Sequence, residues 1–287
     1  MLASFLITFR EALEAALIIG IIAAYVAKIG RKDLNRYIYA GIIGAIIASI
    51  GVALVFKLVY GELEGTAEQL FEGAAALTAA IVLTYMIFWM AANSKKIKGE
   101  VQEKIDISIS KGEMLGVAAL SFIAVFREGV ETVLFLGTLA INAPFDTIFG
   151  FAAGVLAVVL LSFVMFKGIY SLDLSRFFKY TSILLILFSA GLTALGVHEL
   201  NEAGIIPPVV ENVWDVNPPV NPDGSYPFLH ENGLIGSSLK SLIGYNGNPS
   251  LTEVLAYIGY WIIIGIFVYR TYQIPQEVKH GSRYPQD

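Results

Sequence analysis

Long apolar segments separated by polar turns dominate the hydrophobic pattern of this 287-residue chain. A membrane-spanning helix needs about 20 mostly apolar residues, because the hydrocarbon layer is about 30 Å thick and each residue advances about 1.5 Å. Seven segments meet this requirement and predict seven transmembrane helices, at residues 2–27, 38–60, 69–92, 113–140, 147–171, 178–200 and 251–272. We therefore expect an all-α integral membrane protein with a single transmembrane domain over residues 1–272.

The segments between these helices differ in length and composition. Residues 93–112 are expected to form a basic loop, and residues 201–250 a long outer loop rich in proline. Loops of this length commonly serve as lids or binding surfaces. Within the outer loop, residues 234–245 are compatible with a short helix at the membrane interface. Residues 273–287 are polar and predict a disordered cytoplasmic tail.

Composition agrees with the membrane assignment. Hydrophobic residues make up 56% of the chain, charged residues 15%, and the mean hydropathy is +0.69, values that place it outside the soluble globular class. The chain has no cysteine, so disulfides, thiolate metal sites and thiol nucleophiles are excluded. The first apolar run contains Arg10, Glu11 and Glu14, which distinguishes it from a signal peptide. No nucleic-acid partner is expected.

Lysines and arginines are distributed unequally between the two sides of the seven-helix arrangement. Fifteen lie on one side and only Lys57 and Lys240 on the other. By the positive-inside rule, the basic side is cytoplasmic, the N-terminus is outside and the C-terminus inside, as in a multi-pass protein of the cell membrane. The outer side is acidic. Two interpretations stay open: a solvated surface that follows the charge rule, and a field that concentrates cations.

An internal repeat joins the first and fourth predicted helices. FREALEAALIIGIIA begins at Phe9 and FREGVETVLFLGTLA at Phe126, and three charged residues coincide at an offset of 117: Arg10 and Arg127, Glu11 and Glu128, Glu14 and Glu131. Three crossings separate the copies, so these helices run antiparallel. This predicts a 3+3 inverted repeat (residues 1–92 and 113–200) plus one extra C-terminal helix, with a site near the midplane.

The spacing within each motif favours a cation site. Glutamates three residues apart share one face of a helix, and each arginine can pair with the glutamate four residues on. Ionisable groups near the bilayer centre cost about 2.5–3.5 kcal/mol each on insertion scales. Two Arg–Glu pairs that fasten the helices together would leave Glu11 and Glu128 unexplained. Four carboxylates against two guanidiniums leave a net charge of −2, and hard oxygen ligands suit ions such as Mg²⁺, Ca²⁺, Mn²⁺ or Fe³⁺.

Two further groups of ionisable residues lie toward the outer side. Glu68 and Glu72 begin the third predicted helix, and the sequence HELNE ends the sixth. We predict that Glu72, His198 and Glu199 are additional metal ligands at a mouth above the central site. Glu68 and Glu202 would lie at its entrance, with solvated helix ends as the alternative. HELNE lacks the second histidine of a zinc-protease motif.

The sequence resembles the iron permease family, which comprises the ferric iron permeases of fungi and their bacterial and archaeal relatives. REALE, REGVE, FEG followed by LTYMIFWM, and GVHELNEAG carry this resemblance over about residues 1–272. It implies that Glu11, Glu14, Glu128 and Glu131 bind iron, with Arg10 and Arg127 as their motif partners. It also implies a transporter with iron as substrate, no required cofactor, and a separate ferroxidase or extracytoplasmic iron-handling protein as partner.

The expected function is iron import, with Fe(III) the expected ion. An inside-negative potential contributes about 2.3 kcal/mol per charge per 100 mV, or about 7 kcal/mol for Fe(III). The alternatives are a permease for another cation such as Mn(II) or Pb(II), and a membrane metal sensor that does not transport. An intramembrane enzyme is disfavoured, because no nucleophile constellation accompanies the carboxylates.

Overall fold

The computed structural model describes residues 1–93, 96–110, 114–166 and 174–273. Within these ranges the regular structure is entirely helical, with nine α-helices and one short 3-10 helix. The elements are α1 (Leu2–Lys28), η1 (Lys32–Leu34), α2 (Asn35–Gly61), α3 (Thr66–Asn93), α4 (Ile97–Ser110), α5 (Met114–Asn142), α6 (Pro144–Phe166), α7 (Leu174–Glu202), α8 (Leu234–Ile243) and α9 (Leu251–Gln273). The last residues of the predicted fifth helix (167–171) and the predicted tail from 274 onward lie outside the described residues.

The seven long helices coincide with the seven apolar segments of the sequence. By length and composition, five of the helices in the described ranges can cross a membrane: α2, α3, α6, α7 and α9. Helices α1 and α5 are equally long, but each carries the three charged residues of its motif and so exceeds two charges in every 18-residue window. The chain is therefore an all-helical, multi-pass membrane protein.

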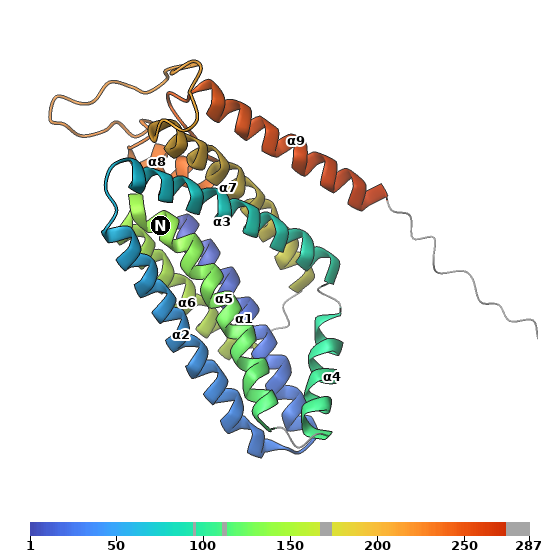
Figure 1. Cartoon of the computed structure of the whole chain (residues 1–287). Coiled ribbons are helices and arrows are strands. Elements are labelled where there is room, and N and C mark those ends of the chain that lie inside the picture. The colour runs from blue at the N-terminus through green and yellow to red at the C-terminus, as the bar shows by residue number, and fades with distance from the viewer. Residues whose placement is uncertain (94–95, 111–113, 167–173, 274–287) are drawn as a thin grey trace, which may run out of the picture.

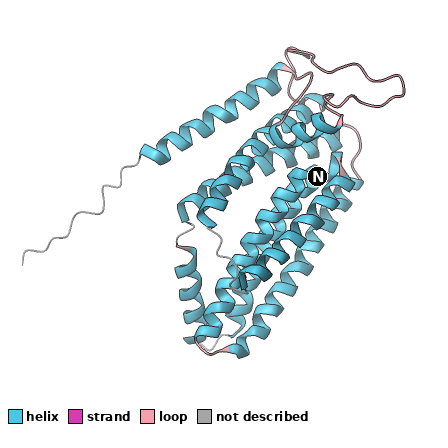
Figure 2. Ribbon diagram, turned by 180° about the vertical axis from the view of Figure 1, so that it is seen from behind, coloured by secondary structure: helices cyan, strands magenta, loops and turns pink. Residues whose placement is uncertain are grey.

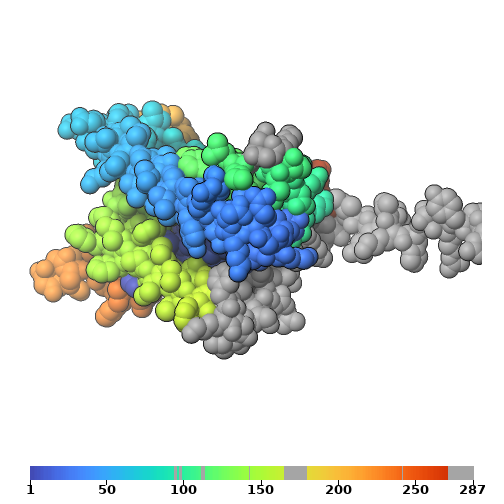
Figure 3. Space-filling view, turned by 90° about the horizontal axis from the view of Figure 1, so that it is seen from below, coloured from blue at the N-terminus to red at the C-terminus, as the bar shows by residue number. Residues whose placement is uncertain are grey.

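Helix α4 corrects the prediction of a basic loop at residues 93–112. Its apolar residues Val101, Ile105 and Ile109 recur every four positions and form a stripe along one face. That stripe packs on α1 around Ile22 and Val26, with Ile105 fully buried. The charged residues between them obscured this amphipathic pattern in the sequence. Figure 3 shows α4 (green) beside the blue surface of the α1–α2 connection.

The long loop between α7 and α9 contacts the bundle through a short helix. The predicted short helix is present as α8, which packs against α7 and α1. Glu231 lies 3.6 Å from Lys240 and accepts a hydrogen bond from the Gly247 amide. Burial raises the pKa of Glu231, but the Lys240 ammonium and these hydrogen bonds outweigh burial and hold this pKa below its ordinary value.

Three helix pairs make the most extensive contacts: α1 with α6, α2 with α5, and α3 with α7. Helices α1 and α5 also pack against each other between these pairs. The α3–α7 pair lies across one end of the bundle, whereas α9 packs on α7 and extends away from the other helices (Figures 1 and 2). The N-terminal amine lies 3.4 Å from Asp146 at the start of α6.

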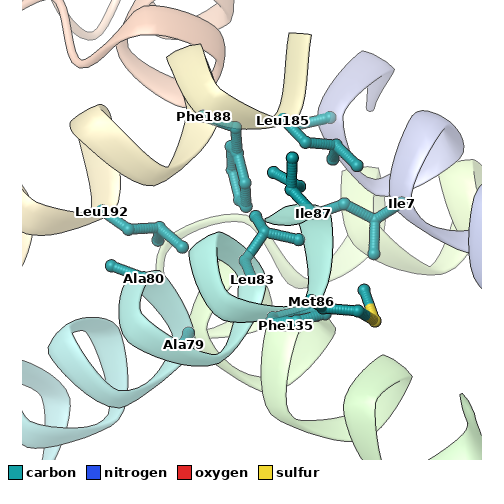
Figure 4. Close-up of a cluster of buried hydrophobic side chains, with 11 residues drawn as sticks. Ile7, Ala79, Ala80, Leu83, Met86, Ile87, Phe135, Leu185, Phe188 and Leu192 are labelled. Carbon is teal, nitrogen blue, oxygen red and sulfur yellow. The ribbon is translucent and has the colours of Figure 1, made fainter. Parts of the chain in front are cut away.

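The main hydrophobic core joins four of these helices. Figure 4 shows Leu83 and Ile87 of α3 facing Leu185 and Phe188 of α7, Met86 of α3 beside Phe135 of α5, and Ile7 of α1 completing the cluster. All seven of these side chains are at most 4% exposed. Through this apolar cluster, α3 and α7 pack against α1 and α5, the helices that carry the charged motifs.

Two glycines permit close helix approach at corresponding places. A Cβ atom on Gly41 of α2 would lie 2.9 Å from the Phe122 amide nitrogen, and one on Gly150 of α6 would lie 2.9 Å from the Phe5 amide nitrogen. Phe122 and Phe5 are themselves related by the offset of 117. Each stacks on the motif phenylalanine one turn later, with ring centroids 5.2 Å and 5.8 Å apart respectively.

Replacing Gly41 by alanine is therefore expected to destabilise the protein by about 1–3 kcal/mol, because the added methyl group meets backbone atoms of α5 that cannot move independently. Gly51 of the same helix has open space around its Cα, so Gly51→Ala is the matched control and should be neutral or stabilising. Thermal unfolding in detergent measures both. Equal melting temperatures for the two variants would contradict this account of α2–α5 packing.

Candidate metal site

The two charged motifs meet where α1 packs against α5. Glu11, Glu128 and Glu131 each offer one carboxylate oxygen, and these oxygens lie within 4.8 Å of one another. Glu11 and Glu128 are 1% and 3% exposed, and the Glu131 side chain is 13% exposed. Oxygen ligands of hard cations lie about 2.0–2.6 Å from the ion, so a single ion can contact all three groups. Among the described residues, this is the only group of three or more acidic, histidine or cysteine side chains arranged to hold a metal ion.

Glu14 lies beside this trio without belonging to it. Its Oε1 atom lies 2.8 Å from Nη2 of Arg10, and its side chain is 4% exposed. Of the four motif glutamates predicted to bind metal, the structure therefore brings three together and holds the fourth in a buried ion pair.

The two motif arginines have different surroundings. Arg10 is buried, with a side chain 2% exposed, and directs Nη1 to Glu11 at 3.0 Å as well as Nη2 to Glu14. Arg127 has a side chain 40% exposed and approaches Glu131 through Nε at 3.0 Å and Glu128 at 3.8 Å. The two motifs have the same charged residues, but their arginines contact the neighbouring glutamates in different ways.

Each motif glutamate has one buried oxygen with no hydrogen-bond partner among the described residues. These atoms are Oε2 of Glu11, Glu128 and Glu131, and Oε1 of Glu14, whose contact with Arg10 is an ion pair without hydrogen-bond alignment. Buried polar groups are nearly always satisfied in folded proteins, and an unsatisfied buried carboxylate oxygen is especially unfavourable. A cation shared by these oxygens would remove the cost.

The residues predicted at the outer mouth form a second acidic cluster. The Tyr60 hydroxyl lies 2.9 Å from Oε1 of Glu68 and 2.8 Å from Oε1 of Glu72. Glu72 also interacts with Glu199 across the α3–α7 contact. The cluster therefore brings together three of the predicted carboxylates, although they do not form a three-ligand group like that of Glu11.

His198 and Glu202 make other contacts. The Nδ1 atom of His198 lies 3.2 Å from Oε1 of Glu253, and its Nε2 atom lies 3.6 Å from Glu202. Glu202 also accepts a hydrogen bond of 3.2 Å from Gln69. These contacts tie the end of α7 to α3 and to the start of α9.

Three residues near these sites were not found from the sequence: Tyr60, Glu253 and Trp89. Tyr60 and Trp89 are aromatic residues in apolar helices, where lipid contact is the ordinary role. Glu253 offered a signal, since it is an acidic residue in the first turn of an otherwise apolar helix.

The described residues thus form a multi-pass helical membrane protein in which three carboxylates converge between α1 and α5. The model of the iron permease FTR1 family matches residues 1–275, and the chain belongs to this family.

Curated relatives match over nearly the whole chain. A ferrous iron permease EfeU from Yersinia pestis is 32% identical over 269 residues, which cover 91% of each protein. Another ferrous iron permease EfeU, from Escherichia coli O6:H1 strain CFT073, is 31% identical over 91% of this chain and 93% of the relative. An uncharacterized protein from Archaeoglobus fulgidus is 36% identical over 95% of this chain and 96% of its own. No solved structure matches the chain. Membership of a permease family and the spanning helices agree in making this chain an iron-transport membrane protein.

Proposed function

We propose that this chain imports iron through a site formed by Glu11, Glu128 and Glu131, with Glu14 as a fourth carboxylate held in reserve by Arg10. The observation that carries the proposal is the convergence of three carboxylates, two buried and one partly buried, each with an oxygen that has no hydrogen-bond partner among the described residues. Four carboxylates and two guanidiniums leave a net charge of −2, which an arriving cation neutralises.

The proposed path runs from the acidic outer side to the basic inner side. Glu72 and Glu199, with Glu68 and Tyr60 beside them, form the mouth that receives iron before it reaches the central site. His198 and Glu202 border this mouth and connect α7 to α9 and α3. Iron is delivered there by a separate ferroxidase or extracytoplasmic iron-handling protein, and the N-terminus lies outside the cell.

In this proposal seven helices span the membrane, and the first six form an inverted repeat of α1–α3 and α5–α7. Three observations support the repeat. The pairing of α1 with α6 mirrors that of α5 with α2. Gly150 meets Phe5 as Gly41 meets Phe122, and both phenylalanines stack on the first residue of a motif. Ser4 and Phe5 match Ser121 and Phe122, 117 positions on, which extends the repeat to before the motifs.

The membrane potential supplies the driving force. An inside-negative potential of 100 mV contributes about 2.3 kcal/mol per charge, or about 7 kcal/mol for Fe(III). The hard carboxylate ligands favour Fe(III) as the transported ion. Fe(II) is the second candidate, because the curated relatives from Y. pestis and E. coli are named ferrous iron permeases.

Uptake of radiolabelled iron into proteoliposomes with an inside-negative potential tests the proposal. Iron is offered as Fe(II) under ascorbate or as Fe(III) citrate, with Mn(II) and Pb(II) as competitors. The wild type should transport iron, and a Glu14→Ala, Glu131→Ala double variant should not. Equal flux in both proteins would show that these two glutamates only pair helices and are not part of the transport site. Competition by Mn(II) or Pb(II) at equal concentration would favour a broader cation permease, and binding without flux would favour a sensor.

A further inference from the structure

Trp89 of α3 lies beneath the guanidinium of Arg127. The Cζ atom of Arg127 is 4.9 Å from the centroid of the Trp89 ring, within the range of a cation–π interaction. In this position Arg127 contacts Glu131 and Glu128 through Nε, at the base of its guanidinium. The planar head of the guanidinium is therefore placed on the indole ring rather than between the two carboxylates.

Arg10 shows how a motif arginine contacts its glutamates when no aromatic ring in the described ranges lies against its guanidinium. Its Nη1 and Nη2 atoms both face carboxylates, at 3.0 Å from Glu11 and 2.8 Å from Glu14. Among the described residues, the cation–π contacts are those of Arg36 with Tyr37 and Arg127 with Trp89, so no aromatic ring holds Arg10. The indole of Trp89 is thus a contact that distinguishes Arg127 from Arg10, although the two arginines have the same motif neighbours.

This difference bears directly on the metal site. Glu128 and Glu131 supply two of the three converging oxygens. If the head of Arg127 turned toward them as Arg10 turns toward its own glutamates, a tethered cation would compete with iron for the same oxygens. A residue that holds the guanidinium on its ring limits Arg127 to its Nε contacts with these carboxylates, so that the two Nη nitrogens do not compete with the ion while the positive charge stays close by.

We propose that Trp89 is a positioning residue for iron binding, which holds the head of Arg127 away from Glu128 and Glu131. This inference rests on the proposed function, since it concerns the affinity of the same site. Trp89 acts through Arg127 and does not itself touch the ion. Removing the ring should therefore weaken iron binding without slowing the later steps of transport.

Variants at position 89 should change the KM for iron and leave the maximal rate nearly constant. Trp89→Leu should raise KM about tenfold, a change within the range of a partly desolvated cation–π contact. Trp89→Tyr and Trp89→Phe should give intermediate values in that order, because their rings attract cations less strongly than indole. Phe88→Leu is the matched control, since the neighbouring Phe88 contacts Phe267 of α9 at a centroid distance of 5.6 Å.

Fluorinated tryptophans separate the electrostatic contribution from packing. In a Trp214→Phe, Trp261→Phe background, mono-, di- and trifluorotryptophan at position 89 keep the shape of the ring while weakening its attraction for cations. The logarithm of KM should rise steadily with the number of fluorine atoms. A KM that does not change with fluorination, in a protein that still transports iron, would overturn the inference and leave the proposed function intact. Absence of iron flux in the wild type would contradict the proposed function itself.

A double-mutant cycle provides the second test. If Trp89 acts through Arg127, then Trp89→Leu should change KM in the wild type and have no further effect in an Arg127→Gln background. An equal KM increase in both backgrounds would show that Trp89 acts by packing alone and would overturn the inference.

Discussion

Replacing Glu128 by glutamine is expected to lower the rate of iron transport at limiting iron concentration by about 100-fold or more. Glu128 is 3% exposed and lies in the trio with Glu11 and Glu131. Two unit charges 4 Å apart interact by about 4 kcal/mol at an effective dielectric constant of 20, and an iron ion carries at least two charges. Loss of one carboxylate charge therefore removes several kcal/mol of binding free energy, where about 1.4 kcal/mol corresponds to a factor of ten.

The glutamine variant should fold normally, which separates loss of transport from loss of structure. Glutamine has nearly the shape of glutamate and removes a buried negative charge next to two others. The variant should thus elute as wild type in gel filtration and melt at the same temperature or higher. Glu103→Gln, on the exposed surface of α4, is the control and should transport at the wild-type rate. Wild-type flux in the Glu128 variant would exclude this carboxylate from the iron path.

Much of the fold could be predicted because the membrane imposes a simple length rule. All seven apolar segments are long helices, and their boundaries within the described residues are close to those expected. Helix α4 was missed because its stability comes from packing Val101, Ile105 and Ile109 on α1, whereas its polar residues resemble a loop. A length rule for apolar segments cannot detect a short amphipathic helix of this kind.

The sequence indicated which residues form the candidate site, but it indicated less about how these residues contact one another. Charged residues in apolar helices are costly, so Glu11, Glu128 and Glu131 stood out in the sequence. The Arg10–Glu14 and Arg127–Glu131 pairs follow from the four-residue spacing within each motif. That Arg127 also lies on Trp89 depends on which side chains α3 brings to the site, and the motifs contain no information on this. Aromatic residues such as Tyr60 gave no signal, because tyrosine is common in membrane helices near the interface.

Arg10→Gln is expected to destabilise the protein by about 3–5 kcal/mol, because removal of one partner from a buried ion pair leaves uncompensated charge. Arg10 is 1% exposed and is the nearest cation to both Glu11 and Glu14. Arg127→Gln is the comparison variant, since the Arg127 side chain is 40% exposed whereas that of Arg10 is 2% exposed, and we expect it to lose less stability. Thermal unfolding in detergent should give a much lower melting temperature for the Arg10 variant than for the Arg127 variant.

A compensating change distinguishes charge balance from packing. If the destabilisation in Arg10→Gln arises from an unpaired Glu14, then Arg10→Gln with Glu14→Gln should recover most of the lost stability, since removal of both partners costs less than removal of one. The double variant would then fold with the trio of Glu11, Glu128 and Glu131 intact, and its iron binding would show what Glu14 adds. A double variant no more stable than Arg10→Gln would show that the lost stability does not come from an unpaired Glu14, and would assign it to the Arg10–Glu11 pair or to the packed arginine side chain.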